Sequence, residues 1–386
     1  MDTVLIKKYK ELFGESQEPH LIRSPGRINL LGEHVDYNMG LVLPAAIDKY
    51  IYIAIQERKD SQIHLYSLDY EELYESSVTE FKRSNKLWAN YILGVVDQFV
   101  KRGENLKGFN MVFSGDIPQG SGLSSSAALE CATAYGLQKL NGFSLDRMEM
   151  AKLAQAAENQ FVGVNCGLMD QFASLHGRKN HLIQFDCESL EYSYFPFTST
   201  DYMFILFNSQ VNHSLASSAY NERREQCEKG VAMIREHHPE IKSLREVSPE
   251  LLDRYVKQQD PLVYQRCTYI VNEIQRVQEA SQALLDDDFI RVGKLMYETH
   301  QGLSQDYDVS CVELDFLVNH LKNNPAVLGS RMMGGGFGGC TINLIKKDRV
   351  DEIIADTASA YKKHTGLVMK SYKVNLVDGT EDLTFS

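Results

Sequence analysis

The stretch with the clearest chemical signature is Gly115-Asp-Ile-Pro-Gln-Gly-Ser-Gly-Leu-Ser-Ser-Ser-Ala-Ala128. Gly120 and Gly122 permit a sharp turn and a close approach of the backbone to a ligand. Ser124 to Ser126 then fall in the first turn of an Ala- and Leu-rich segment that is predicted to be helical. The free N–H groups and the dipole at the start of a helix attract anions. A phosphate-binding loop explains three serines behind paired glycines better than a helix cap, which requires only one.

This stretch differs from two familiar phosphate-binding motifs. It lacks the lysine of the P-loop G-x-x-x-x-G-K-[ST]. It also departs from the dinucleotide fingerprint G-x-G-x-x-G, because Ser125 occupies the place of the third glycine. The sequence therefore predicts a glycine-rich phosphate loop of another kind.

A compact polar cluster lies near the start of the chain. Glu33, His34 and Asp36 follow a predicted strand and a glycine break, and Arg27 lies a few residues upstream. Carboxylates and imidazole accept hydrogen bonds from hydroxyl groups, so these residues suit a polyhydroxyl ligand. A solvated loop with a local Arg–carboxylate pair explains the cluster equally well. The residues alone leave both interpretations open.

Two further carboxylates occupy positions that suggest catalysis. Glu158 is expected near the C-terminal end of a helix over residues 144–161, where the helix dipole disfavours a negative charge. A magnesium ion would remove that penalty, and so would a surface salt bridge. Asp170 is flanked by Met169 and Phe172, so we expect apolar surroundings that suit a general base. An aspartate at the start of a helix is the alternative.

Two other features have both a ligand and a packing interpretation. The stretch Ser330-Arg-Met-Met-Gly-Gly-Gly-Phe-Gly-Gly-Cys-Thr341 has five glycines in six residues, which permit close backbone contact with a ligand or with another backbone. Trp88, the single tryptophan, and Tyr91 share one face of a predicted helix over residues 86–100. They are either core residues or a stacking surface for a purine.

Composition excludes several classes of protein. The chain has 386 residues, enough for two domains, and 43% of them are hydrophobic. The net charge is −12 without a long basic run, which argues against a nucleic-acid surface. A polyphosphate ligand then requires locally concentrated positive potential. Seven scattered cysteines, an odd number without a C-x-x-C pair, indicate neither a disulfide framework nor a zinc site. Without a secretory or membrane-spanning apolar run, we expect a cytoplasmic protein.

The elements that must position these residues alternate between strands and helices. A strand over residues 109–113 precedes the phosphate loop, and a helix over 123–137 follows it. Further strands are predicted at 28–31, 41–55, 63–68, 203–207, 340–345 and 369–374. Further helices are predicted at 3–13, 86–100, 144–161, 220–234, 311–321 and 347–364, and within 247–302. An aromatic-rich segment near residue 195 suggests a boundary between domains 1–195 and 196–386.

Three separated motifs together resemble one known family. Pro25-Gly-Arg-Ile-Asn-Leu-Leu-Gly-Glu-His-Val-Asp-Tyr37 is similar to the galactokinase signature. Gly120-Ser-Gly-Leu-Ser-Ser-Ser-Ala-Ala128 resembles the ATP loop of the GHMP small-molecule kinases, and Gly334-Gly-Gly-Phe-Gly-Gly339 resembles their third motif. Gly167-Leu-Met-Asp-Gln-Phe172 and the segment His213 to Cys227 also look like galactokinase. Met333 departs from the family pattern, which has a threonine there.

The resemblance implies a two-domain α+β GHMP kinase fold with the active site between the domains. Asp170 would be the catalytic base and Arg27 the cation beside it. Hydroxyl groups of the sugar would be held by Glu33, His34, Asp36, Gly167, Asp170 and Tyr220. ATP would be bound by Trp88, Tyr91, Gly120, Ser121, Gly122, Leu123, Ser124, Ser125 and Ser126. Ser126 and Glu158 would ligate Mg²⁺.

The function implied is transfer of the γ-phosphoryl group of MgATP to the anomeric hydroxyl of α-D-galactose, the galactokinase reaction of galactose metabolism. The expected partners are the small molecules galactose and ATP, without nucleic acid or membrane, and the expected state is a monomer. Two alternatives remain. One is a sibling kinase for N-acetylgalactosamine, arabinose or galacturonate. The other is a catalytically silent regulator that binds galactose and ATP, against which the intact Ser124-Ser-Ser-Ala-Ala128 argues.

Overall fold

The first half of the chain is built on a six-stranded sheet. The computed structural model describes residues 2–14, 18–118, 120–212 and 216–384. The strand order is β13-β1-β3-β6-β4-β5, antiparallel except where β4 pairs with β6. The strands are β1 (His20–Asn29), β3 (Pro44–Glu57), β4 (Gln62–Ser67), β5 (Glu72–Ser77), β6 (Phe109–Gly115) and β13 (Glu381–Asp382). Because β13 pairs with β1, the end of the chain returns to this sheet.

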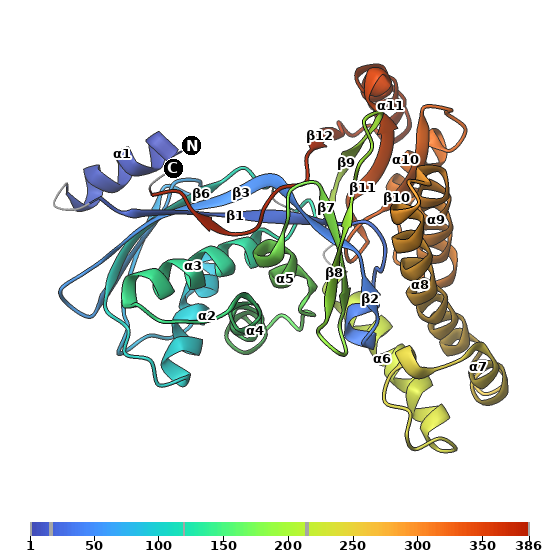
Figure 1. The fold of residues 1–386 in the computed structure, drawn as a ribbon, viewed down its shortest axis with the longest axis horizontal. Helices are drawn as coiled ribbons and strands as arrows, with labels where there is room; N and C mark the ends of the chain where they lie inside the picture. The colour runs from blue at the N-terminus through green and yellow to red at the C-terminus, as the bar shows by residue number, and fades with distance from the viewer. Residues whose placement is uncertain (1, 15–17, 119, 213–215, 385–386) are drawn as a thin grey trace.

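Helices cover both faces of the six-stranded sheet (Figure 1). One face carries α2 (Leu87–Lys101), α3 (Ser125–Asn141), α4 (Arg147–Ala156) and α5 (Met169–His176). The apolar side chains on this face form a continuous core, because Ile53, Phe109 and Leu137 are all fully buried. On the opposite face, α1 (Asp2–Phe13) packs Leu5 and Tyr9 against Ala54 and Val112.

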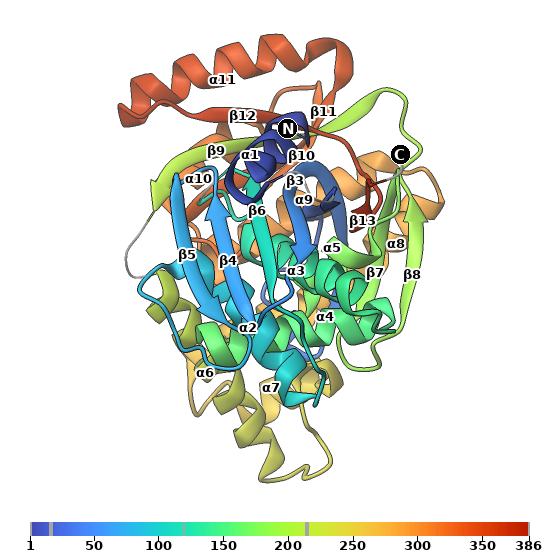
Figure 2. The same ribbon diagram turned by 90° about the vertical axis from the view of Figure 1, so that its left-hand side faces the viewer.

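A second layer is built on a four-stranded antiparallel sheet of order β10-β11-β9-β12. These strands are β9 (Tyr202–Asn212), β10 (Val327–Met332), β11 (Gly338–Lys346) and β12 (Lys370–Val374). The helices of this half are α6 (Ala216–Arg235), α7 (Pro249–Tyr255), α8 (Pro261–Leu285), α9 (Phe289–Gln301), α10 (Val312–Leu321) and α11 (Val350–Thr365). Figure 2 shows α11 running beside β12 at the outer edge of the molecule. A three-stranded sheet, β2 (Leu41–Val42), β7 (His181–Asp186) and β8 (Tyr192–Pro196), lies between the two halves in Figure 1.

Most of the predicted elements are confirmed, with ends shifted by a few residues. The strand predicted over residues 28–31 is an exception, because β1 begins at His20 and ends at Asn29. The strand predicted over residues 41–55 is divided at residue 43 into β2 and β3. The helix predicted over 144–161 ends as α4 at Ala156 and continues as a π-helical turn (η2, Ala157–Val162) that contains Glu158. Strands β5, β7, β8, β10 and β13 were not predicted. The proposed domain boundary near residue 195 stays a prediction.

An irregularity in the pairing of β1 with β3 prepares the site. The register shifts between Pro25 and Arg27, as in a β-bulge. Gly26 is required there, because a Cβ on it would lie 2.7 Å from the carbonyl oxygen of Leu123. The Arg27 amide donates to that same carbonyl at 3.2 Å. The bulge therefore ties the end of β1 to the glycine loop before α3.

Within the described part of the chain, no helix is long and apolar enough to cross a membrane.

Candidate active site

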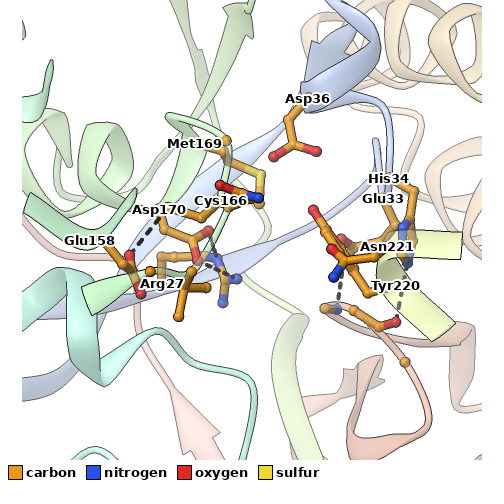
Figure 3. A pocket seen from close by; sticks show the side chains of 17 residues that line it. Arg27, Glu33, His34, Asp36, Glu158, Cys166, Met169, Asp170, Tyr220 and Asn221 are labelled. Atoms are coloured by element: carbon orange, nitrogen blue, oxygen red, sulfur yellow. Dashed lines mark hydrogen bonds and ion pairs between the residues drawn. The ribbon is translucent and has the colours of Figure 1, made fainter. Parts of the chain in front are cut away.

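A cavity of about 440 Å³ collects the predicted catalytic and sugar-binding residues, and its size is that of a small-molecule site. It is lined by Arg27, Glu33, His34, Asp36, Glu158, Gly163, Val164, Asn165, Cys166, Gly167, Met169, Asp170, Tyr220, Asn221 and Gly334 to Gly336. In Figure 3, Arg27, Asp170 and Glu158 lie on one side, with Glu33, His34, Tyr220 and Asn221 opposite them. All the residues proposed to bind the sugar, and Glu158, line this one cavity.

The centre of the site is a bidentate ion pair between Arg27 and Asp170. The Arg27 Nε donates to Asp170 Oδ1 at 2.9 Å, and Nη2 donates to Oδ2 at 3.1 Å. Nη1 of Arg27 donates to the carbonyl oxygen of Gly122, and the Ser124 hydroxyl donates to Asp170. Both members of the pair therefore contact the glycine loop that was predicted to bind phosphate.

The prediction that the Asp170 carboxylate has apolar surroundings is wrong. Phe172 is fully buried and stacks on Phe185, with ring centroids 3.9 Å apart, so it points into the core. Successive side chains of a helix point in different directions, and the first turn of α5 turns Asp170 towards Arg27 instead. The carboxylate is held by a guanidinium and a hydroxyl.

Glu33 is held by a second, fully buried arginine. Arg331 of β10 donates from Nη2 to Glu33 Oε1 at 3.0 Å, and the Gly334 amide donates to the same oxygen at 2.9 Å. The remaining Arg331 donors bind the carbonyls of Asn29, Leu30 and Met332. One guanidinium thus joins the end of β1, the Glu33 carboxylate and the start of the second glycine loop. None of these hydrogen bonds uses Oε2 of Glu33.

Asp36 packs directly over Gly167. A Cβ on Gly167 would lie 2.0 Å from Asp36 Oδ2, so a larger residue at this position would displace the Asp36 carboxylate. Burial, together with the negative charge of Asp170, raises the pKa of Asp36 to about 6. The carboxylate is therefore ionised at neutral pH but at a cost in free energy.

His34 lies in an aromatic cage and is almost completely buried. Its ring centroid lies 5.2 Å from that of Tyr220, 5.9 Å from Tyr37 and 5.0 Å from Tyr307. Burial lowers the pKa of His34 to about 4, so the imidazole is neutral at pH 7.

Glu158 lies at the inner end of a buried carboxyl cluster. Gln171 donates from Nε2 to Glu158 Oε2 at 2.7 Å and to Glu130 Oε2 at 3.1 Å. Burial raises the pKa of Glu158, and hydrogen bonds from Cys166, Ser126 and Gln171 oppose the rise. Burial and the charge of Glu158 raise the pKa of Glu130 as well. The surface salt bridge considered for Glu158 is wrong, because this carboxylate is 6% exposed and turns inward.

The two glycine loops lie side by side at the edge of the cavity. A Cβ on Gly334 would lie 3.8 Å from the carbonyl oxygen of Gly122, and one on Gly339 would lie 3.6 Å from that of Ser121. Ser124 adopts a left-handed backbone conformation with φ 59°, and α3 begins at the next residue, Ser125. A strained residue at the start of a helix is common where a ligand binds. Residues 120 to 126 do not line the cavity itself.

Trp88 and Tyr91 also lie outside the cavity lining. The Trp88 ring packs against Phe113 at 5.3 Å between centroids, and its N–H donates to Glu72 at 3.0 Å. Trp88 is thus part of the core, and Tyr91 is half-buried on the same helix. Contact of either ring with adenine stays a prediction. His213 to Leu215, in the motif that resembles galactokinase, lie outside the described residues.

Several residues of the site were not predicted. Asn221 and Cys166 line the cavity, and Arg331 and Tyr307 support it from behind. Asn221 directly follows Tyr220, which gave the only sequence signal. Arg331 and Tyr307 reach the site through tertiary packing of β10 and of the turn after α9, which no local pattern reveals.

Comparison with known proteins identifies relatives of the whole chain. A family model of the galactokinase galactose-binding signature matches residues 7–57. Models of the N-terminal and C-terminal domains of GHMP kinases match residues 90–178 and 280–363. A galactokinase of Fusobacterium nucleatum is 40% identical over 97% of this chain and 98% of its own length. A galactokinase of Clostridium acetobutylicum is 40% identical over 98% of each chain.

The fold is that of the GHMP kinases. The crystal structure of Lactococcus lactis galactokinase complexed with galactose has a TM-score of 0.95 and 34% identity, covering 99% of both chains. The mevalonate kinase of Methanococcus jannaschii has a TM-score of 0.65 at 18% identity, covering 94% of this chain and all of its own, and it shares the fold alone.

Replacement of Arg331 should destabilise the protein severely. In Arg331→Met, the buried Glu33 carboxylate and three backbone carbonyls lose their donor, which costs about 3–5 kcal/mol of unfolding free energy. Denaturant unfolding measures the loss. Arg349→Met is the control, because it breaks an exposed ion pair with Glu352 that contributes only about 0–1 kcal/mol. Equal losses in both variants would contradict the account.

Asp36 gives a stability effect whose sign depends on pH. Its folded pKa of about 6 lies above the ~3.9 of an unfolded aspartate, so its ionisation destabilises the fold above pH 6. That penalty disappears as the pH falls through 6 towards 4. Asp36→Asn should therefore raise the unfolding free energy at pH 7.5 by about 1–3 kcal/mol and much less at pH 4.5.

Asp253→Asn provides a control of opposite sign for this measurement. A hydrogen bond from Lys257 lowers the pKa of Asp253, so its amide variant should be slightly less stable at pH 7.5. Greater stability of Asp36→Asn at pH 4.5 than at pH 7.5, each relative to the unsubstituted protein, would contradict the assignment.

Proposed function

Because the chain belongs to the galactokinase family of the GHMP kinases, we propose that it phosphorylates α-D-galactose at the anomeric hydroxyl. It is an ATP-dependent sugar kinase, and the products of the proposed reaction are α-D-galactose 1-phosphate and ADP. The observation that carries the proposal is the Arg27–Asp170 ion pair. This pair lies between the polar cluster of the cavity and the glycine loop.

Positioning is the first requirement of phosphoryl transfer. In the proposed complex, Glu33, Asp36 and Asp170 accept hydrogen bonds from sugar hydroxyls. Gly167 leaves room for the Asp36 carboxylate, and Tyr220 closes the opposite wall of the cavity. The sugar would thus lie with its anomeric hydroxyl against Asp170. The phosphates of ATP would lie on the glycine loop and the N-terminus of α3.

Asp170 is the proposed base. It takes the proton of the anomeric hydroxyl, and the hydroxyl oxygen forms a bond to the γ-phosphorus. The bond between that phosphorus and the β–γ bridging oxygen breaks, and ADP leaves with the electron pair. Arg27 orients the Asp170 carboxylate through its two hydrogen bonds and stabilises negative charge on the transferred group. Met333, which directly precedes the second glycine loop, replaces the family's threonine and is buried. Methionine has no hydroxyl group to offer at this position.

Ser126 and Glu158 are the proposed ligands of Mg²⁺. Magnesium is commonly bound through one or two carboxylates, with waters and substrate phosphates completing its coordination. A buried carboxylate whose pKa is raised by burial, hydrogen-bonded to a serine at the start of α3, fits such a site. When bound, the metal would neutralise charge on the ATP phosphates. The cytoplasmic location and the monomeric state expected from the sequence stay predictions.

A coupled ADP-release assay across a panel of sugars tests the substrate. We expect galactose to give the highest kcat/KM, ahead of N-acetylgalactosamine, arabinose and galacturonate. The four ring hydroxyls and the hydroxymethyl group of galactose match an acceptor-rich cavity, and galacturonate would place a carboxylate against other carboxylates. A higher kcat/KM for another sugar would establish the sibling kinase. Binding of galactose without any ADP release would establish the silent regulator.

Substitution of the base gives a second, independent result. Asp170→Asn cannot take the proton, so kcat should fall by about 10²- to 10⁴-fold while the protein remains folded. Initial rates at saturating galactose and ATP, with circular dichroism as the folding check, measure this. Asp356→Asn, an exposed aspartate that accepts a hydrogen bond only from His320 among the contacts described, should keep normal turnover. Near-normal turnover of the folded Asp170→Asn protein would rule out the base assignment.

A further inference from the structure

The backbone of His34 is strained and is held in its conformation by a hydrogen bond. Its φ of 63° lies in the left-handed region, which costs a residue with a Cβ about 1 kcal/mol or more. The Asn38 side chain donates to the His34 carbonyl at 3.0 Å and holds this conformation. A strained residue held in place inside a binding cavity indicates that the orientation of its side chain matters.

The partners of the ring show which nitrogen carries the proton. His34 Nε2 lies 3.2 Å from the carbonyl oxygen of Gly335, in the second glycine loop. A carbonyl oxygen only accepts hydrogen bonds, so Nε2 must be the donor. His34 Nδ1 lies 2.9 Å from the Tyr37 hydroxyl. Because the buried ring is neutral, Nδ1 carries no proton, and it accepts a hydrogen bond from the Tyr37 hydroxyl.

The direction of this hydrogen bond fixes the direction of two more. Tyr37 uses its only O–H group to donate to His34, so its oxygen must accept a hydrogen bond from the Tyr307 hydroxyl at 2.8 Å. Tyr307 in turn has no second proton, so it must accept from the Cys227 thiol at 3.2 Å. Tyr37, Tyr307 and Cys227 thus form a continuous series of donors, which we call the hydroxyl–thiol chain.

The hydroxyl–thiol chain is rigidly mounted. Tyr307 and Cys227 are at most 1% exposed. Arg223 of α6 donates from Nε to the backbone carbonyl of Tyr307 at 2.6 Å. This hydrogen bond fixes the turn after α9 against α6. A hydrogen-bonded series of this kind, with its far end buried and supported, leaves the imidazole little freedom to rotate or to exchange tautomers.

We propose that the hydroxyl–thiol chain makes His34 a hydrogen-bond donor to the sugar, an inference that rests on the proposed function. The Gly335 carbonyl, which accepts from His34 Nε2 at 3.2 Å, belongs to a residue that lines the cavity together with His34. In the proposed complex, a sugar hydroxyl oxygen beside this carbonyl would share the Nε2–H donor. The three members of the chain are positioning residues, because they act through His34.

This assignment reverses the role expected for the imidazole. The sequence suggested that His34 accepts from a hydroxyl, as Glu33 and Asp36 do. A donor among carboxylate acceptors lets one hydroxyl accept from His34 while it donates to a carboxylate. The combination recognises a hydroxyl group and disfavours a ligand that presents only donors or only acceptors there.

Nitrogen-15 NMR of histidine-labelled protein tests the tautomer without any substrate. At pH 7.5, the two-bond proton–nitrogen spectrum should show His34 protonated at Nε2 and unprotonated at Nδ1, its signals being assigned by their absence from His34→Gln. Tyr37→Phe removes the donor to Nδ1 and should shift that nitrogen signal. A charged ring, or protonation at Nδ1 in the unsubstituted protein, would overturn the proposal.

Kinetics of the same variants test the contact with the sugar. Loss of one orienting hydrogen bond in Tyr37→Phe should raise KM for galactose by about threefold to tenfold, with KM for ATP changed by less than about twofold. Tyr297→Phe is the matched control, because its buried hydroxyl has no partner among the described residues. Cys227→Ser keeps a donor and should retain the normal spectrum and KM, whereas Cys227→Ala should raise KM for galactose.

The outcomes separate this inference from the proposed function. If the protein phosphorylates galactose and Tyr37→Phe leaves its spectrum and KM unchanged, the chain does not position His34 and the inference fails alone. If the spectrum is as expected and another sugar is preferred, the substrate assignment fails, and KM for that sugar then tests the contact. Equal changes in KM for galactose and for ATP in Tyr37→Phe would indicate a general structural effect and would also overturn the inference.

Discussion

The site depends on two buried arginines, each paired with a carboxylate. Arg27 binds Asp170 bidentately, and Arg331 binds Glu33 while it holds three backbone carbonyls. Removal of either guanidinium would leave a carboxylate of the site without its compensating charge, which is costly away from water. Each of these cations is already paired with a carboxylate in a chain whose net charge is −12, so the N–H groups at the start of α3 are left to attract an anionic ligand.

Each arginine also joins segments that are distant in sequence. Arg27 connects the bulge of β1 to the first glycine loop and to α5, and Arg331 connects the end of β1 to the second glycine loop. Because the guanidinium donors are arranged in a fixed fork, the partners are held at defined relative positions. The cavity therefore has its polar residues in place before a ligand binds, and little ordering energy is lost on binding.

Local patterns in the sequence predicted most helices, the main strands and the polar residues around the cavity. Periodicity predicts helices and strands because burial of one face is a local requirement. Residue type identified Asp170 as a candidate base, and Glu33 and Asp36 as candidate sugar-binding residues. What local patterns missed is set by tertiary contact. Strand β10 carries Ser330 and Arg331 fully buried, so it shows no alternation. The tautomer of His34 and the partners of Asp170 follow from residues up to 301 positions away.

The proposed role of Asp170 is to receive the anomeric proton beside the phosphate loop. A crystal structure with galactose and a non-hydrolysable ATP analogue would show the geometry of this step. We expect the anomeric oxygen about 2.6–3.2 Å from an Asp170 carboxylate oxygen, with the γ-phosphate at the N-terminus of α3. A sugar bound with its anomeric hydroxyl turned away from Asp170, or a γ-phosphate remote from that helix, would contradict it.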